Sequence, residues 1–213
     1  MVSRAPVDNP PTAFADLLQD LELGDGPHGY WLECITSGAR VHVVDLRHMA
    51  AHTQVSVEEY LRTSFDGPEP DYLDGEIVER GMPNLPHSNA QGRLMVWFAG
   101  MEEKWSIRCF PDLRLRVGER RYRVADLAVF QAWPTEDVPS TPPLVAIEIL
   151  SPDDRFAEIL TKLEEYRAWG VTHVWFVNPM SRKLYVYSAG LSEVAALSLP
   201  EYGVEIAAPE VFR

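Results

Sequence analysis

Two carboxylates each stand alone in a segment that is otherwise apolar. Asp126 lies in residues 124–130 and Glu148 in residues 144–150, and every other side chain of both segments is apolar. Such runs predict strands that are buried on both faces of a sheet. A buried carboxylate without a partner costs several kcal/mol or gives up its charge. Glu148 therefore needs a compensating cation, a hydrogen-bond network or a metal.

A lysine follows the two carboxylates. Lys162 lies in a helix that is predicted directly after the Glu148 strand. Two carboxylates on neighbouring strands can hold one hard cation such as Mg²⁺. The cation would polarise a phosphodiester oxygen and lower the pKa of a bound water, and the lysine could position that water or offset charge on the phosphorus centre. Asp126, Glu148 and Lys162 are thus the smallest set that predicts metal-assisted phosphodiester hydrolysis.

Each of these residues also has a simpler interpretation. Asp126 could cap a turn or pair with Arg123 or another nearby arginine, and Glu148 could form a buried salt bridge. Lys162 could form a solvated ion pair with Glu158, four residues before it on the same helix face, which would contribute a few tenths of a kcal/mol. The residues alone leave these alternatives open.

Four further polar residues lie near this set in the predicted fold. Glu76 could be a third ligand or hold a water, or it could be a solvent-facing edge residue. His87, just before a predicted helix, could reach the site, and Ser151 could cap the next helix or contact the site. Asp112 follows a proline but precedes an arginine-rich alternating strand. It is therefore more typical of a turn before that strand, and we prefer Asp126 as the ligand.

The elements that must position these residues alternate between strands and helices, as in an α/β fold. Capping boxes predict helix starts at Ser56 and at Ser88, and the Asp74-Gly75 pair predicts a tight turn between two short strands. A hairpin, the Glu148 strand and a helix that ends at Gly170 follow. The predicted ranges of this later part are strands 107–117, 121–130, 144–150, 171–177, 184–187 and 204–206, and helix 154–169.

The first fifty or so residues predict a separate piece. Residues 12–23 predict a helix, and residues 30–35 and 40–46 predict a hairpin. We expect residues 1–54 to be an N-terminal extension and residues 55–213 to be the main domain. The extension is expected to cover a sheet edge or to make a homodimer contact rather than to do chemistry.

Composition limits the class of protein. The chain has 213 residues, of which 46% are hydrophobic, enough for one domain with a full core. No stretch approaches the roughly 20 apolar residues of a membrane span, and the start lacks the apolar core of a signal peptide. Cys34 and Cys109 are isolated and fit neither a zinc site nor a disulfide framework. We therefore expect a cytoplasmic protein.

A basic segment interrupts an acidic chain. The net charge of −13 argues against general affinity for nucleic acid. Residues 104–123 nevertheless hold seven cations against two acids. The simpler interpretation is a solvated hairpin face. The cations that we expect to follow a DNA backbone are Arg114, Arg116, Arg121 and Arg123.

Several blocks of this sequence together resemble a known family. They are residues 72–79 (YLDGEIVE), 123–126 (RVAD), 147–155 (IEILSPDDR), 162–171 (KLEEYRAWGV) and 174–179 (VWFVNP). Their order and spacing resemble the Uma-two family of restriction-endonuclease-like proteins, within the PD-(D/E)XK nuclease superfamily. The resemblance spans residues 55–188 and implies a restriction-endonuclease-like core, a central mixed sheet flanked by helices.

The resemblance also implies functional residues. It assigns Asp126 and Glu148 as ligands of Mg²⁺ or Mn²⁺, Lys162 as the lysine of the site, and DNA as the substrate. Ala125 stands where the family has proline, and Leu150 stands where the superfamily has its lysine, so that Lys162 must supply the cation from the helix. We expect a DNA endonuclease, or else a catalytically inactive nuclease fold that serves as a binding or assembly module.

Overall fold

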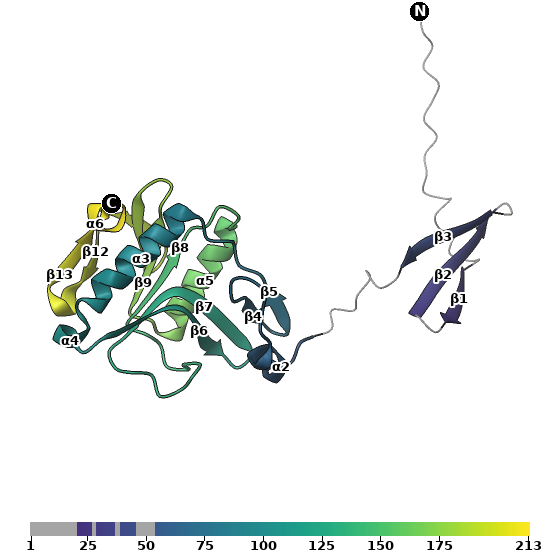
Figure 1. Cartoon of the computed structure of the whole chain (residues 1–213), viewed down its shortest axis with the longest axis horizontal. Coiled ribbons are helices and arrows are strands. Elements are labelled where there is room, and N and C mark those ends of the chain that lie inside the picture. The colour runs from purple at the N-terminus through teal and green to yellow at the C-terminus, as the bar shows by residue number, and fades with distance from the viewer. Residues whose placement is uncertain (1–20, 27–28, 37–38, 46–53) are drawn as a thin grey trace, which may run out of the picture. The chain divides into compact units, whose positions relative to one another are not determined.

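The structure is a computed structural model that describes residues 21–26, 29–36, 39–45 and 54–213 (Figure 1). The chain divides into two compact units, Met1–Thr53 and Gln54–Arg213. Among the described residues no helix is both long enough and apolar enough to cross a membrane.

The first unit contains an antiparallel sheet. Its strands are β1 (Leu21–Gly26), β2 (Gly29–Thr36) and β3 (Ala39–Asp45), in the order β1-β2-β3. The predicted hairpin is present as β2 and β3. The helix expected over residues 12–23 lies mostly outside the described residues, and its last three residues belong to β1. For those three residues the helical prediction is wrong.

The second unit is built on an eight-stranded mixed sheet. The order is β11-β10-β9-β8-β7-β4-β5, and β6 also pairs with β7. Only the β8–β9 pair is parallel. The strands are β4 (Asp71–Leu73), β5 (Glu76–Val78), β6 (Arg108–Gly118), β7 (Arg121–Phe130), β8 (Val145–Ile149), β9 (His173–Asn178), β10 (Lys183–Tyr187) and β11 (Leu191–Val194).

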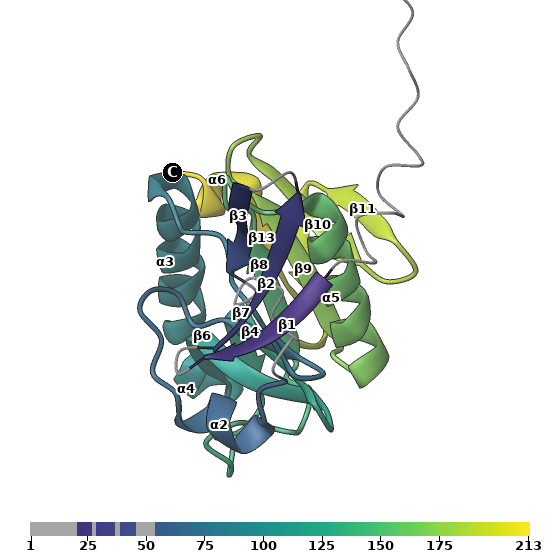
Figure 2. The same cartoon turned by 90° about the vertical axis from the view of Figure 1, so that its right-hand side faces the viewer.

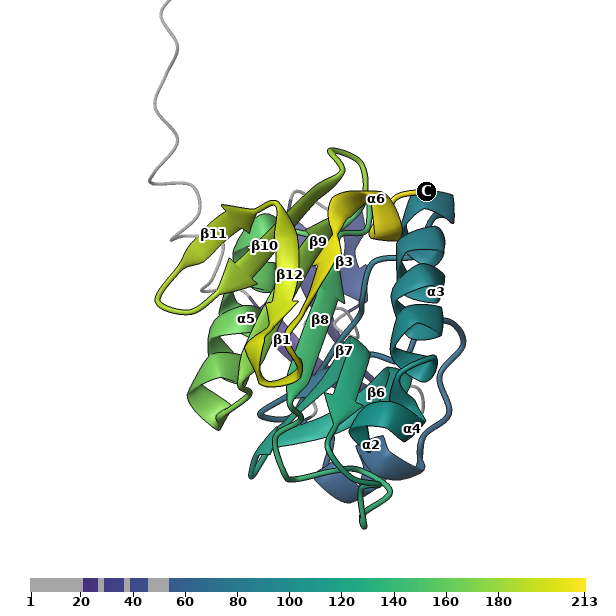
Figure 3. The same cartoon turned by 90° about the vertical axis from the view of Figure 1, so that its left-hand side faces the viewer.

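Two long helices cover the two faces of this sheet (Figure 2, Figure 3). On one face, α3 (Leu85–Ala99) packs Leu94 and Phe98 into a core with Ile147 and Trp175. On the other face, α5 (Phe156–Trp169) packs its apolar side chains against small residues such as Ala128 and Ala146 and against Phe176. Successive residues of β8 therefore enter different cores, which is why the strand is apolar along its whole length.

Smaller elements complete the second unit. Helix α2 (Val57–Arg62) begins at Ser56, whose hydroxyl accepts a hydrogen bond of 3.1 Å from Glu59 N, and it places Tyr60 against Tyr72 and Tyr122. The remaining elements are α4 (Glu102–Trp105), the hairpin of β12 (Ala196–Leu199) and β13 (Val204–Ala207), the 3₁₀ turn η2 (Pro200–Tyr202) between those strands, and α6 (Ala208–Val211).

Most of the predicted elements are present, but one helix start is wrong. Helix α3 begins at Leu85, and its N-cap is Asn84, whose side chain accepts a hydrogen bond of 3.0 Å from His87 N. The capping box expected at Ser88 lies inside the helix. Pro86 lies in the first turn of this helix, where proline is tolerated because its missing N–H has no intrahelical partner.

Candidate functional site

The site lies where one edge of β7 changes partner. Strand β6 pairs along nearly the whole of β7, so β4 and β8 must share the other edge. On that edge β4 pairs with residues 121–122 and β8 with residues 127–129. Residues 123–126 lie between the two, where β7 has no strand partner on this edge. Their backbone groups must find other partners, since buried peptide groups are rarely left unpaired.

Side chains satisfy the backbone in this gap. Val124 N donates to Asp71 Oδ1 at 2.8 Å, and Val124 O accepts from Lys162 Nζ at 2.8 Å. On the facing strand, Ile149 N donates to Asp126 Oδ2 at 2.6 Å. The gap thus concentrates charged side chains inside the protein, because they replace the missing sheet bonds.

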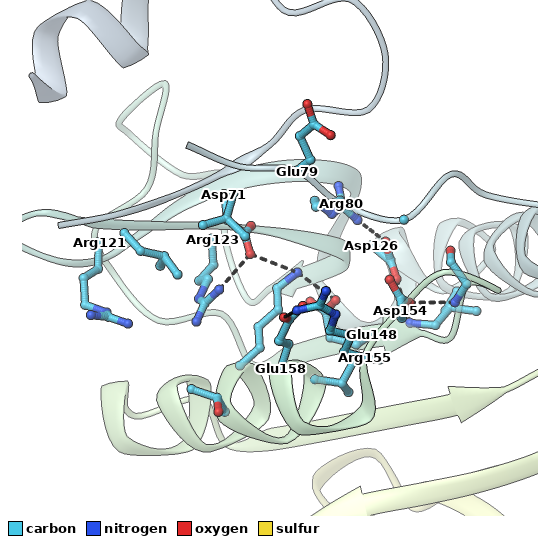
Figure 4. Close-up of a pocket in the computed structure, with 18 residues that line it drawn as sticks. Asp71, Glu79, Arg80, Arg121, Arg123, Asp126, Glu148, Asp154, Arg155 and Glu158 are labelled. Atoms are coloured by element: carbon cyan, nitrogen blue, oxygen red, sulfur yellow. Dashed lines mark hydrogen bonds and ion pairs between the residues drawn. The ribbon is translucent and has the colours of Figure 1, made fainter. Parts of the chain in front are cut away.

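Asp126 and Glu148 meet across this gap. The antiparallel register pairs Leu127 with Ile147 and Ala128 with Ala146, so one further step places Asp126 opposite Glu148. Directly opposed residues of an antiparallel pair point to the same face. Both side chains line one cavity of about 290 Å³ (Figure 4).

Helix α5 supplies both partners of Glu148. Lys162 Nζ lies 2.8 Å from Glu148 Oε2, and Tyr166 OH donates to Oε1 at 2.9 Å. The two partners are four residues apart and so share one helix face. The pKa of Glu148 is raised to about 7, because burial and the negative charge of Asp126 raise it more than the positive charge of Lys162 lowers it. The carboxylate is therefore held in place at a cost that a second cation would reduce.

Asp126 has a different set of partners. Its Oδ2 accepts from Ile149 N and lies 3.3 Å from His87 Nε2, and its Oδ1 forms an ion pair with Arg80. Burial pushes the pKa of Asp126 upward, but the His87 hydrogen bond and the charges of Arg80 and Lys162 together hold it below its usual value. Asp126 is thus an ionised, buried carboxylate.

Asp71 and Arg123 form a further buried ion pair beside the Lys162–Glu148 pair. Asp71 Oδ2 accepts from Arg123 Nη1 at 2.9 Å, and Arg123 Nε donates to Glu165 Oε2 at 2.7 Å. Arg121 Nη2 also donates to Glu165, at 2.6 Å. Lys162 Nζ lies 3.8 Å from Asp71 Oδ2, which links this pair to Glu148 (Figure 4).

A close backbone approach fixes one wall of the cavity. Gly81 lies so near the loop after β8 that a Cβ added to it would come within 2.5 Å of Asp154 Oδ1 and 3.0 Å of Ser151 Cβ. Asp154 in turn accepts from Ser151 N at 2.7 Å. The segment that carries Arg80 is therefore seated directly against the β8–α5 loop.

The structure brings together most of the residues that the sequence predicted for the site. Asp126, Glu148, Lys162 and Ser151 line the cavity, and His87 contacts Asp126. Lys162 is 6% exposed and bonded to Glu148, and Glu158 pairs with Arg155 instead, so the solvated pair considered for Lys162 is absent. Ser151 does not cap the next helix, whose N-cap is Arg155.

One predicted residue lies elsewhere, and several were missed. Glu76 is exposed on β5 and is not among the residues that line the cavity. The missed residues are Asp71, Arg80, Tyr166 and Glu165. Asp71 begins a strand of three residues, which is too short to show alternation. Tyr166 carried a weak signal, since it lies one turn after Lys162.

Two of the four arginines that we expected to follow a DNA backbone are paired with acids in the structure. Arg123 is 5% exposed and bound to Asp71 and Glu165. Arg114 pairs with Glu69, and its Cζ lies 4.4 Å from the ring centroid of Tyr60. Alternation along a strand indicated exposure, but here the acids of neighbouring elements neutralise both cations. Arg116 is exposed, and Arg121 lines the cavity.

The donor set suits a hard divalent cation. Each carboxylate oxygen has two lone pairs, and the contacts described above leave lone pairs on Asp126 Oδ1 and on both oxygens of Glu148. Mg²⁺ is commonly bound by one or two carboxylates with waters completing its shell. Among residues 54–213, no group of three or more acids, histidines or cysteines is placed to hold a metal.

Comparisons with known proteins identify a family from the sequence and a similar fold among solved structures. Residues 57–213 match the family model described as "Uma2: Putative restriction endonuclease". The fold is similar to the crystal structure of "a putative nuclease belonging to DUF820 from Anabaena variabilis ATCC 29413". That match has a TM-score of 0.66 and 22% identity, over 74% of this chain and 97% of the other. No curated protein matches.

Proposed function

Because this chain belongs to the Uma2 family, we propose that it is a nuclease that hydrolyses DNA phosphodiester bonds with Mg²⁺ or Mn²⁺. Asp126 and Glu148 are the proposed metal ligands, and Lys162 assists. One observation carries the proposal: the two carboxylates lie opposite each other across β7 and β8 and line the same cavity.

The protein's own contribution is to hold the two carboxylates still. Tyr166 and Lys162 fix the two oxygens of Glu148, while Ile149 N and His87 fix Oδ2 of Asp126. Such supporting hydrogen bonds orient ligands and tune their basicity. A divalent cation bound between these carboxylates would polarise the phosphodiester and make water a better nucleophile.

Lys162 has a donor left for the substrate. Its ammonium carries three N–H groups, and two of them go to Val124 O and Glu148. Asp71, at 3.8 Å, is beyond hydrogen-bond distance. The third N–H can donate to a phosphate oxygen and offset the negative charge that develops there.

DNA would meet few free cations on this acidic chain. Of the arginines that line the cavity, Arg121 and Arg155 are the more exposed, with side chains 36% and 82% exposed. We expect these two side chains to contact phosphates of the substrate. With few phosphate contacts, the affinity for DNA should fall only modestly with salt.

A catalytically inactive binding module is the second candidate, and one observation favours it. Both carboxylates already have a cationic partner, Arg80 for Asp126 and Lys162 for Glu148. In such a module these pairs would be purely structural, and the family fold would serve for assembly.

Metal binding separates the two candidates. Calorimetric titration with Mn²⁺ should show one site in the parent protein, and Asp126→Asn and Glu148→Gln should lose it along with cleavage of plasmid DNA. Glu158→Gln is the matched control, because Glu158 lines the same cavity but pairs only with the exposed Arg155 among the described contacts. If the parent protein binds no Mn²⁺, the nuclease proposal fails and the inactive binding module is the candidate that remains.

Lys162 can be tested separately. Lys162→Ala should keep Mn²⁺ binding, because the metal replaces the lysine as the compensating charge beside Glu148, and it should lower the cleavage rate. Loss of Mn²⁺ binding with the fold intact would show that Lys162 instead builds the metal site.

A further inference from the structure

Arg80 differs from the other cations that line the cavity in the segment that carries it and in the acids that it contacts. Arg80 lies in residues 79–84, which have no regular secondary structure, and its side chain is 14% exposed. Its Nη2 pairs with Asp126 Oδ1, and its Nη1 lies 3.6 Å from Asp112 Oδ1. Asp126 is buried, whereas the Asp112 side chain is 57% exposed. The guanidinium therefore bridges the interior of the cavity and the surface.

Arg80 contacts the one oxygen of Asp126 that nothing else contacts. Oδ2 is taken by Ile149 N and His87, so a metal must approach through Oδ1. A guanidinium and a divalent cation repel each other at such short range, and they would share a single carboxylate oxygen. The two cannot both bind tightly.

We propose that Arg80 exchanges partners when the metal binds. In the metal-free protein it neutralises Asp126; when the cation arrives, it leaves Asp126 for Asp112 and for a phosphate of the substrate. The inference rests on the proposed function and extends it to a residue that contacts substrate. The planar guanidinium suits a phosphate, which it can bind through two parallel hydrogen bonds.

The backbone around Arg80 favours a movement of the side chain alone. Gly81 lies so close to the side chains of Asp154 and Ser151 that an added Cβ would clash with them, so the backbone beside Arg80 has little room to move toward the β8–α5 loop. Asp112 is held by a hydrogen bond of 3.2 Å from Gln91 Nε2. The acceptor for the displaced arginine is thus already in place.

Calorimetric titration of the full chain with Mn²⁺ tests the exchange. Arg80→Ala should bind Mn²⁺ about tenfold more tightly than the parent, a change of about 1.4 kcal/mol. Arg80→Lys, which keeps the charge, should stay near the parent. Arg155→Ala is the matched control, since it removes a cation that lines the same cavity without touching Asp126; it should change the affinity less than about twofold, as expected of an exposed charge.

A second readout tests the contact with substrate. Cleavage of plasmid DNA at saturating Mn²⁺ should fall in Arg80→Ala although the metal binds more tightly. Faster cleavage would overturn the phosphate contact and leave Arg80 as a competitor only. If Arg80→Ala does not fold, Arg80→Gln removes the charge and keeps a hydrogen-bond donor, with the same expected signs.

The outcomes distinguish this inference from the proposed function. If the parent binds no Mn²⁺, the metal site itself is wrong and both fall. If the parent binds Mn²⁺ and the uncharged Arg80 variants bind it equally or more weakly, the exchange is wrong and the nuclease proposal stands.

Discussion

Two aspartate–arginine pairs occupy the same gap in the sheet, and they differ in how the arginine is held. Asp71 and Asp126 each accept a hydrogen bond from the main chain of a neighbouring strand. The partner of Asp71 is Arg123, which is carried by β7 itself and bound on its far side by Glu165. The partner of Asp126 is Arg80, which lies outside any helix or strand.

We interpret the Asp71–Arg123 pair as structural and the Asp126–Arg80 pair as part of the proposed site. Arg123 has two acidic partners, and little solvent reaches it. Arg80 has one buried and one exposed acid, so that its pairing can change. Arg123 thus holds one half of the gap, and the other half is where the proposed metal would bind. The predictions below test this contrast.

The largest effect is expected at the fixed pair. Arg123→Met should destabilise the protein by about 3–5 kcal/mol, because it leaves Asp71 and Glu165 without their common cation in a buried position. Urea unfolding without metal measures the change. A loss below about 1 kcal/mol, typical of an exposed pair, would show that Arg123 is not the structural partner described here.

The next effect is a change in pH dependence at Glu148. Burial, opposed by Lys162 and reinforced by Asp126, raises the pKa of Glu148 from 4.5 to about 7. Folding therefore favours the protonated form of Glu148. The stability that this preference contributes is fully present below pH 4.5 and is lost as the pH rises to about 7. Relative to Glu148→Gln, the parent should lose at most about 3 kcal/mol across this window.

Unfolding curves of both proteins in the presence of a chelator, at several values between about pH 5 and pH 8, measure this dependence. Glu158→Gln is again the control and should follow the parent. In the same window Mn²⁺ should bind the parent more tightly as the pH rises, because the metal displaces a proton. Parallel stability curves for the parent and Glu148→Gln would contradict the raised pKa.

A smaller loss is expected at the exchangeable pair. Arg80→Met should cost about 1–2 kcal/mol without metal, since Asp126 keeps its bonds to Ile149 N and His87. Excess Mn²⁺ should recover this loss, because the cation then neutralises Asp126 and stabilises the folded state that binds it. A loss as large as that of Arg123→Met, with no recovery, would mean that the two pairs are equivalent.

The smallest effect concerns the orientation of one ligand. Tyr166→Phe removes a single hydrogen bond to Glu148 Oε1 and should destabilise the protein by about 1–2 kcal/mol, as for a bond to a charged group. Mn²⁺ affinity should fall because the carboxylate is less firmly oriented. Unchanged Mn²⁺ affinity would show that Lys162 alone is enough to orient Glu148.

The sequence predicted the framework better than the environment of the site. Solitary carboxylates in apolar strands predicted that Asp126 and Glu148 lie on neighbouring strands, as they do, and ordered blocks predicted the family and the fold class. These signals are local or depend on spacing. The partners of the carboxylates come from distant segments, and no pattern in residues 71–80 indicates that Asp71 and Arg80 turn inward.

For the arginines of residues 104–123, the sequence pattern indicated more exposure than the structure shows. Alternating arginines on a strand are typical of an exposed face, yet Arg123 is buried because Asp71 and Glu165 meet it from two other elements. Which cations stay free depends on tertiary pairing, and a list of charges along the chain does not contain that information.

The shared edge of β7 also determines the order in which the residues of the site become available during synthesis. A chain that has emerged from the ribosome only as far as β7 carries Asp126, but β8 and α5 are still to come. It lacks Glu148 and the amide of Ile149, and it lacks Lys162. Such a nascent chain has only one of the two proposed metal ligands, so the proposed nuclease activity would require that β8 and α5 have joined the sheet.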